Sequence, residues 1–144
     1  MAIEFKNSMK INETFSTYDA IESITKKLVE LCNVLGYTED DTMMLHLAVY
    51  EMMVNSVKHG HRYDSSKVGK INGTIYEDRW IISISDEGDG FDYEKICNTS
   101  LDIVDIYQTS GRGIPLAKQI VDSLVFENGG RKVTLSSCIG QNKS

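Results

Sequence analysis

The sequence predicts an α+β fold, a two-layer sandwich in which a mixed or antiparallel sheet carries three helices on one face. Segments whose apolar residues alternate with period two come mostly as neighbouring pairs, which is typical of hairpins. Segments with apolar residues at steps of three and four come separately and predict helices. The expected order is β α α β β α β β, which favours one layer of helices packed on a sheet.

Size and composition indicate a single globular domain. The chain has 144 residues, of which 41% are hydrophobic and 25% charged, and its net charge is −6. This charge argues against non-specific binding to nucleic acid or to an anionic membrane. The three cysteines lie too far apart for a disulfide framework or a zinc knuckle, and no leader or long apolar run is visible. We expect one cytoplasmic domain over residues 1–144.

A strand and an amphipathic helix are predicted first. Residues 3–11 alternate loosely and indicate a strand, and residues 17–36 then change to helical spacing. Asp19 with Glu22 resembles a capping box, and Gly36 suits the end of this helix.

The second helix, residues 38–60, is predicted to be largely buried. Thr38 with Asp41 resembles a capping box and Gly60 suits its end. Apolar side chains cover nearly its whole circumference. They are Met43, Met44, Leu45, Leu47, Ala48, Val49, Met52, Met53, Val54 and Val57.

The second half of the chain predicts two hairpins and a third helix. Residues 67–88 form a hairpin that turns at Glu77–Asp78, and residues 92–112 lack periodicity and indicate a long loop or lid. Residues 113–125 predict a helix with Pro115 in its first turn, and residues 124–137 predict a closing hairpin.

Polar residues interrupt the apolar second helix. Glu51 and Asn55 are four residues apart and share a face, and His59 lies four further on. A buried carboxylate needs a partner, a metal or a wet cleft, although the pair also fits a solvent-facing stripe. His59 by itself fits a helix end, where its charge suits the dipole.

The stretch "SDEGDGFDYE", residues 85–94, follows a predicted strand. A calcium loop that begins at Asp86 needs oxygen ligands at Gly88 and Gly90 and a glycine at Phe91, so calcium is excluded. The alternate glycines suit a backbone that bends sharply or approaches a ligand closely. A plain acidic turn is the alternative interpretation.

The stretch "SGRGIPL", residues 110–116, opens the third helix. Gly111 and Gly113 leave amides exposed at the positive end of the helix dipole, and Arg112 adds charge. Such a helix start suits an anion or phosphate, but the pattern alone is a weak signal.

Together these motifs resemble a known family. "EMMVNSVKHG", "DEGDGF" and "GRGIPL" resemble the N, G1 and G2 boxes of the ATP-binding superfamily of gyrase, heat-shock chaperones, histidine kinases and mismatch-repair ATPases. Their form is most similar to the stand-alone anti-sigma serine kinases of the RsbW type, over residues 20–136. The resemblance implies a Bergerat-type, histidine kinase-like ATPase fold with residues 92–112 as an ATP lid.

The resemblance also implies ATP and Mg²⁺ as cofactors. It makes Glu51 the general base and Asn55 a magnesium ligand. It makes Asp86 the acceptor for the adenine amino group, which favours adenine over guanine. The other implied cofactor-binding residues are His59, Gly88, Gly90, Phe91, Gly111, Arg112, Gly113, Ile114 and Thr134.

Two positions depart from the family pattern. Arg131 stands where members often have the threonine that supports the adenine site, so Thr134 or a water would substitute. Pro115 stands where a larger apolar residue is more frequent, and it stiffens the hinge of the lid.

The resemblance implies a serine/threonine kinase that acts as an anti-sigma factor. Its partners would be a small anti-anti-sigma protein of the STAS type, as phosphorylation substrate, and a sigma factor. A homodimer through the first helix and first strand is a further expectation, with no direct contact to nucleic acid or membrane. The alternatives are a non-catalytic ATP-binding regulator, against which Glu51 argues, and the catalytic domain of a histidine kinase. Against the latter, residues 17–28 contain no phosphoacceptor histidine.

Overall fold

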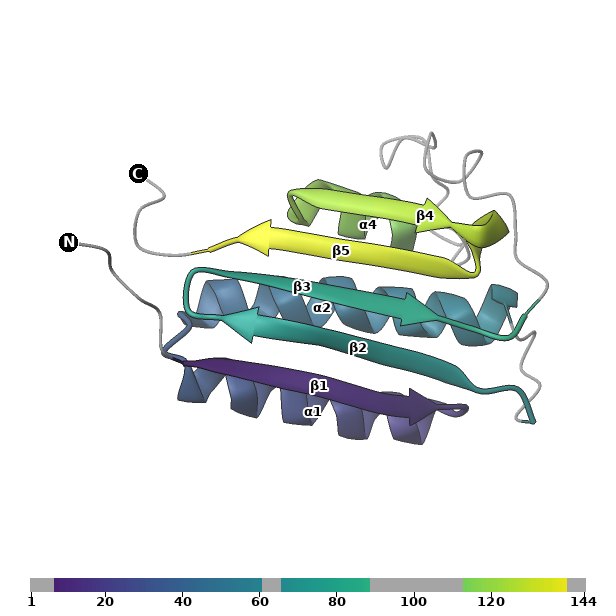
Figure 1. Ribbon diagram of the computed structural model, residues 1–144, viewed down its shortest axis with the longest axis horizontal. Coiled ribbons are helices and arrows are strands. Elements are labelled where there is room, and N and C mark those ends of the chain that lie inside the picture. Colours follow the sequence, from purple (N-terminus) through teal and green to yellow (C-terminus); the bar gives the residue numbers. More distant parts are fainter. Residues whose placement is uncertain (1–6, 61–65, 89–112, 140–144) are drawn as a thin grey trace.

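The structure is a computed structural model that describes residues 7–60, 66–88 and 113–139. In these ranges a five-stranded sheet forms one layer and the helices form the other (Figure 1). The strand order is β1-β2-β3-β5-β4, and each neighbouring pair is antiparallel. The predicted α+β class is confirmed, and of the two sheet types the antiparallel one is found.

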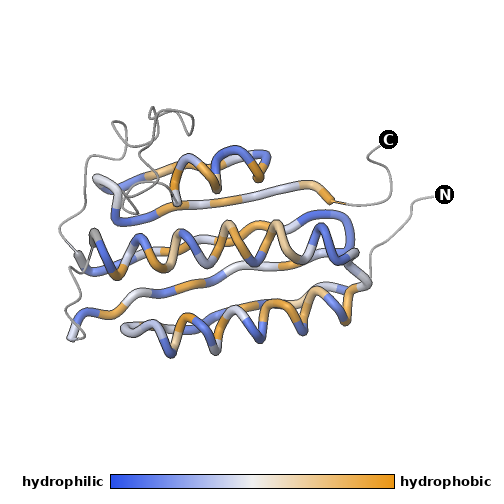
Figure 2. Tube along the Cα trace, turned by 180° about the vertical axis from the view of Figure 1, so that it is seen from behind, coloured by the Kyte–Doolittle hydropathy of each residue, from blue (hydrophilic) through white to orange (hydrophobic). Residues whose placement is uncertain are grey.

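The elements follow the predicted order. Figure 2 shows the helices from behind, all on one face of the sheet. The strands are β1 (Ser8–Phe15), β2 (Gly69–Tyr76), β3 (Arg79–Ser85), β4 (Ser123–Glu127) and β5 (Lys132–Cys138). The α-helices are α1 (Tyr18–Val34), α2 (Glu39–Asn55) and α4 (Gly113–Ile120), and the short helical turns are η1 (Ser56–Gly60) and η2 (Asn128–Gly130).

The first strand and the first cap differ from prediction. β1 lies later than residues 3–11, because it pairs with β2 from Ser8 opposite Tyr76 to Phe15 opposite Gly69. Residues 3–6 of that prediction are outside the described ranges. The N-cap of α1 is Thr17, whose hydroxyl accepts a hydrogen bond from Ala20 N–H at 3.2 Å. The Asp19–Glu22 capping box is therefore wrong, since the helix has already begun at Tyr18.

The turn between α1 and α2 is tied to the sheet. Gly36 has a φ of 82°, which ends α1 as predicted, and Tyr37 N–H donates to Cys32 O at 3.0 Å. The hydroxyl of buried Tyr37 lies 2.6 Å from Tyr76 O and 3.1 Å from Arg79 O. These two carbonyls flank the β2–β3 turn, so one phenol connects the helix layer to the predicted hairpin.

Helix α2 is buried on one side in its first turns and nearly all round in its last turn, where Met52, Met53, Val54 and Asn55 are all buried. Thr38 caps it as predicted, by accepting from Asp41 N–H at 3.1 Å. In the first turns the buried side chains recur at steps of three and four, and Met43 and Met44 fall outside this stripe with exposed fractions of 66% and 45%. The prediction of nearly complete burial is therefore wrong for the first turns of the helix.

The third predicted helix is shorter than expected. α4 ends at Ile120, and residues 123–127 form edge strand β4, in which Leu124 pairs with Leu135 and Phe126 with Val133. A short apolar run fits a helix or a strand equally well, and here pairing with β5 decides. No helix within the described ranges is long and apolar enough to span a bilayer.

Candidate functional site

The last turns of α2 carry two polar residues on one side. Glu51 is half-buried, and Asn55, the final residue of α2, is 9% exposed. Their spacing of four places them one above the other on the helix. The interpretation that they form a solvent-facing stripe does not hold for Asn55, because its side chain is buried.

The helix changes type directly after Asn55. Residues Ser56–Gly60 form a π-helical turn, and Ser56 Oγ donates to Met52 O at 3.2 Å. The second predicted helix thus ends at Gly60 as expected, but its last five residues are π-helical and not α-helical. π-turns inside helices are frequent at functional sites, because the wider turn re-aims the side chains that follow. His59 lies in this turn, and its side chain is outside the described part of the structure.

The environment of Glu51 favours its protonated form. Burial raises the pKa of the Glu51 carboxyl above its usual range, and the positive charge of Lys58 partly opposes this. Lys58 was not among the predicted site residues, although its spacing of seven from Glu51 was a usable signal. A carboxylate whose pKa lies closer to neutrality is a better general base.

The start of α4 packs against Glu51. A Cβ atom placed on Gly113 would lie 2.5 Å from Glu51 Oε2 and 3.3 Å from its Cβ, so glycine is required for this close approach. The first amides of a helix lack partners within it and suit an anion. The carboxylate of Glu51 therefore lies beside a helix start, and a helix start is the kind of place at which anions bind.

The remaining predicted residues around α4 differ in accessibility. Ile114 is fully buried in the core, so its side chain anchors α4 and only its backbone can serve a ligand. Pro115 is buried in the first turn, as predicted. Gly111 and Arg112 lie outside the described ranges, as does the predicted lid.

Asp86 lies in a hydrogen-bonded turn directly after β3. Its N–H donates to Arg131 O at 2.8 Å, and its Oδ1 accepts from the N–H of buried Gly88 at 2.8 Å. This carboxylate–amide bond is the pattern of an Asx-turn, which holds the side chain in a set direction. Gly90 and Phe91 are outside the described residues.

Three of the predicted segments meet at one end of the molecule. Figure 1 shows the end of α2, the end of β3 and the start of α4 at the same end. This follows from the topology, since α2 and β3 run toward that end and α4 starts from it. Glu51, Asn55, Asp86 and Gly113 are therefore brought to one region.

Thr134 does not belong to that region. Its Oγ1 lies 3.0 Å from Ser83 Oγ, and the two residues are paired across β3 and β5. Their neighbours Ile82 and Leu135 are fully buried toward the helices, so Thr134 faces the opposite side of the sheet. The expectation that Thr134 replaces the missing threonine is corrected by this register.

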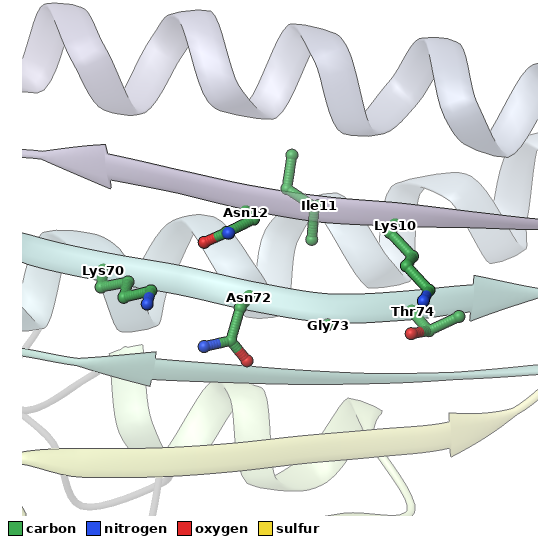
Figure 3. Close-up of a pocket in the computed structure, with 7 residues that line it drawn as sticks. All are labelled: Lys10, Ile11, Asn12, Lys70, Asn72, Gly73 and Thr74. Atoms are coloured by element: carbon green, nitrogen blue, oxygen red, sulfur yellow. The ribbon is translucent and has the colours of Figure 1, made fainter.

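A separate hollow lies on the open face of the sheet. It has a volume of about 350 Å³ and is lined from β1 and β2 (Figure 3). Apart from the core residue Ile11, its side chains are polar and lie on the face of the sheet that points away from the helices, as is typical of the solvated face of an antiparallel sheet. This hollow is therefore distinct from the region around Glu51. Its lining residues are Lys10, Ile11, Asn12, Lys70, Asn72, Gly73 and Thr74.

The residues at the α2–α4 end fit a nucleotide with magnesium. In the described ranges no three His, Cys, Asp or Glu side chains form a metal cage. Magnesium seldom uses one, since it keeps waters and takes phosphate oxygens with one or two protein ligands. Asn55 offers such a ligand, and a helix start such as that of α4 is the kind of place that suits a phosphate.

Comparison with known proteins gives consistent matches. The profile of the histidine kinase-like ATPase domain matches residues 15–137. Serine-protein kinase RsbW of Bacillus subtilis (strain 168) is 30% identical over 99 residues, which cover 65% of this chain and 62% of the relative. Serine-protein kinase RsbW of Staphylococcus aureus (strain JH9) is 35% identical over 112 residues, or 72% of this chain and 70% of the relative. The match thus spans less than two thirds of the Bacillus protein.

Proposed function

Because the chain belongs to the histidine kinase-like ATPase family and is of the RsbW type, we propose that it is an ATP-dependent serine/threonine protein kinase that acts as an anti-sigma factor. The observation that carries this proposal is the contact between the Glu51 carboxylate and the start of α4 at Gly113. It puts a proton acceptor beside a site suited to phosphate, which is what phosphotransfer to a hydroxyl requires.

Each residue then has a defined task. Glu51 takes the proton of a partner serine hydroxyl, and its burial supports this because burial raises the pKa of its carboxyl. The first amides of α4 bind phosphate, and Asn55 gives one ligand to Mg²⁺. Asp86 accepts from the adenine amino group, with its direction held by the Gly88 amide. The cofactor, bound as ATP with Mg²⁺, supplies the phosphoryl group and neutralises its charge.

The partners follow from the same family membership. We propose a small anti-anti-sigma protein of the STAS type as substrate, and a sigma factor that binds in alternation with it. The chain would work in the cytoplasm as one ATPase domain over residues 1–144, with self-association into a homodimer. The name of the relatives, serine-protein kinase, supports the choice of serine as acceptor.

A phosphotransfer assay tests the proposal. The purified chain is mixed with radiolabelled ATP, Mg²⁺ and a STAS-type protein, and Glu51→Gln is the variant. We expect the variant to bind a fluorescent ATP analogue with nearly unchanged affinity but to transfer label at least about a hundredfold more slowly.

The alternatives give different results in the same assay. Nucleotide binding without transfer by the unmodified chain would indicate a non-catalytic regulator. Acid-labile label on a histidine would indicate a histidine kinase. Full transfer by Glu51→Gln would remove Glu51 as the base.

A further inference from the structure

A groove of about 470 Å³ lies between α1 and α2, apart from the α2–α4 region. It is formed by the second half of α1 and the first turns of α2, on the side of both helices that the core does not use. The part of α2 that bears Glu51 and Asn55 is one to four turns further along the chain. The groove is lined by Val29, Asn33, Glu39, Thr42, Met43 and His46.

The floor and walls of the groove are mainly apolar. Met43 leaves 66% of its surface exposed, although it stands beside a buried face of the same helix. Methionine is a flexible and polarisable side chain that adapts to apolar partners at binding surfaces. Ring stacking against Tyr50, with centroids 6.1 Å apart, orients His46 at one end of the groove.

One buried polar atom in the groove has no partner. Thr42 is 8% exposed, and its Oγ1 makes no hydrogen bond among the described residues. A buried hydroxyl without a partner is unfavourable, so such atoms are rare in folded proteins. Its Oγ1 is almost inaccessible to solvent, so Thr42 contributes to the wall of the groove without offering this atom to a ligand.

One wall of the groove carries a negative charge. Glu39 lines the groove, and Asp40 and Asp41 follow it in the first turn of α2. In the described ranges the ion pairs are Lys27 with Glu13 and Arg79 with Asp78, so none of these three acids is paired. The carboxylate of Glu39 and the net charge of −6 of the chain both favour a basic partner.

We propose that this α1–α2 groove docks a basic amphipathic helix of a partner protein. Its apolar side chain packs between Val29 and Met43, and a lysine or arginine lies against Glu39. An amphipathic helix laid into an apolar groove between two helices is a recurrent recognition mode. This inference is independent of phosphotransfer, because it uses neither Glu51 nor nucleotide.

The test uses two synthetic peptides of about 15 residues, a length at which helices begin to be stable. Both carry the same leucine stripe at helical spacing, and the other positions are lysine in one peptide and glutamate in its analogue. Binding to the full chain is followed by two-dimensional NMR. We expect the lysine peptide alone to bind and to shift amide signals of α1 and the first turns of α2.

Variants localise the binding. Met43→Asp should weaken the lysine peptide at least about tenfold, whereas the matched control Met44→Asp should stay within about twofold, since Met44 is exposed but outside the groove. Glu39→Lys should weaken binding of the lysine peptide and allow the glutamate analogue to bind. This variant also tests the location of the groove if Met43→Asp does not fold.

Several results would overturn the proposal. One is equal binding of the two peptides, and another is an equal effect of the Met43 and Met44 variants. A third is a change in sedimentation mass with Met43→Asp, which would make the groove a contact between copies of this chain. Glu51→Gln should leave peptide binding unchanged, so that failure here and failure of the kinase proposal are separate results.

Discussion

The Glu51 carboxylate lies against the backbone of Gly113, where a Cβ atom would come within 2.5 Å of its Oε2. This contact joins α2 to the first residue of α4, and the two residues are 62 positions apart in the sequence (113 − 51). The proposed proton acceptor and the proposed phosphate-binding helix start are therefore in direct contact. A methyl group on residue 113 would displace the Glu51 carboxylate from its present position.

Gly113→Ala should disturb the site more than the fold. The new Cβ would push the Glu51 carboxylate aside, and small displacements of a reacting group are costly in rate. We expect phosphotransfer to fall about tenfold or more, with a loss in the free energy of unfolding of about 1 kcal/mol. Phosphotransfer rate and urea unfolding measure the two effects. Adding Glu51→Asp, which shortens the side chain, should restore stability, and a failure to do so would mean that the clash lies elsewhere.

Glu51→Gln should stabilise the protein at neutral pH. Because burial raises the pKa of this carboxyl in the folded state, its stabilising contribution is present below the unfolded pKa and is lost as pH rises through the folded pKa. Glutamine has no such dependence. We expect the free energy of unfolding of Glu51→Gln to exceed that of the unsubstituted protein by up to about 0.5 kcal/mol near neutral pH, because the group is half-exposed, and to equal it at about pH 4. Urea midpoints measured across this pH range check the sign, and a gain that grows toward acid would contradict it.

Asp86→Asn should weaken ATP binding while the local turn persists. Asparagine keeps an oxygen that can accept from the Gly88 amide, but its charge is lost and it adds a donor facing the adenine amino group. We expect an affinity loss of about ten- to a hundredfold by titration calorimetry. Asp86→Ala is the comparison, since it also removes the turn bond and should lower the melting temperature. Unchanged affinity in both variants would place adenine elsewhere.

Thr134→Val should leave ATP affinity within about twofold, because a residue on the far face of the sheet has no access to the site. The hydroxyl that it removes bonds Ser83 and not the α2–α4 region. Calorimetry under the conditions used for Asp86→Asn provides the measurement. A loss as large as that of Asp86→Asn would mean that the register of β3 and β5 differs from the one described.

Gly36→Ala should destabilise the fold by about 1 kcal/mol through the backbone alone. Gly36 has a φ of 82°, and an added Cβ would meet no atom within 4 Å, so packing does not contribute. Gly36→Asn is the matched control, because asparagine tolerates this conformation better, and it should cost less. Urea unfolding of the three proteins gives the order, and equal stability of all three would contradict it.

Features set by neighbouring residues were predictable from the sequence. The Thr38 cap, the Glu77–Asp78 turn and the glycine stop at Gly36 each depend on a few adjacent positions. The two polar residues of α2 were also found this way, because helical spacing alone places Glu51 and Asn55 together. Local chemistry accounts for most element types and for their order.

Features set by distant pairing were not predictable. The side of the sheet on which Thr134 lies depends on its register with Ser83, and the strand character of residues 123–127 depends on β5. The exposure of Met43 depends on how α1 packs against α2. The contact of Gly113 with Glu51 required the packing of α4, which no single-segment pattern contains.

The pairing of β1 with β2 has a consequence for how the chain folds. Phe15 pairs with Gly69 although α1 and α2 separate the two residues in the sequence, whereas β2 and β3 are joined by a tight turn. Closing a long loop costs more entropy than closing a short one, and non-local pairings slow folding. We therefore expect the β2–β3 hairpin to form before β1 pairs with β2. This order is the reverse of the order in which these strands are synthesised.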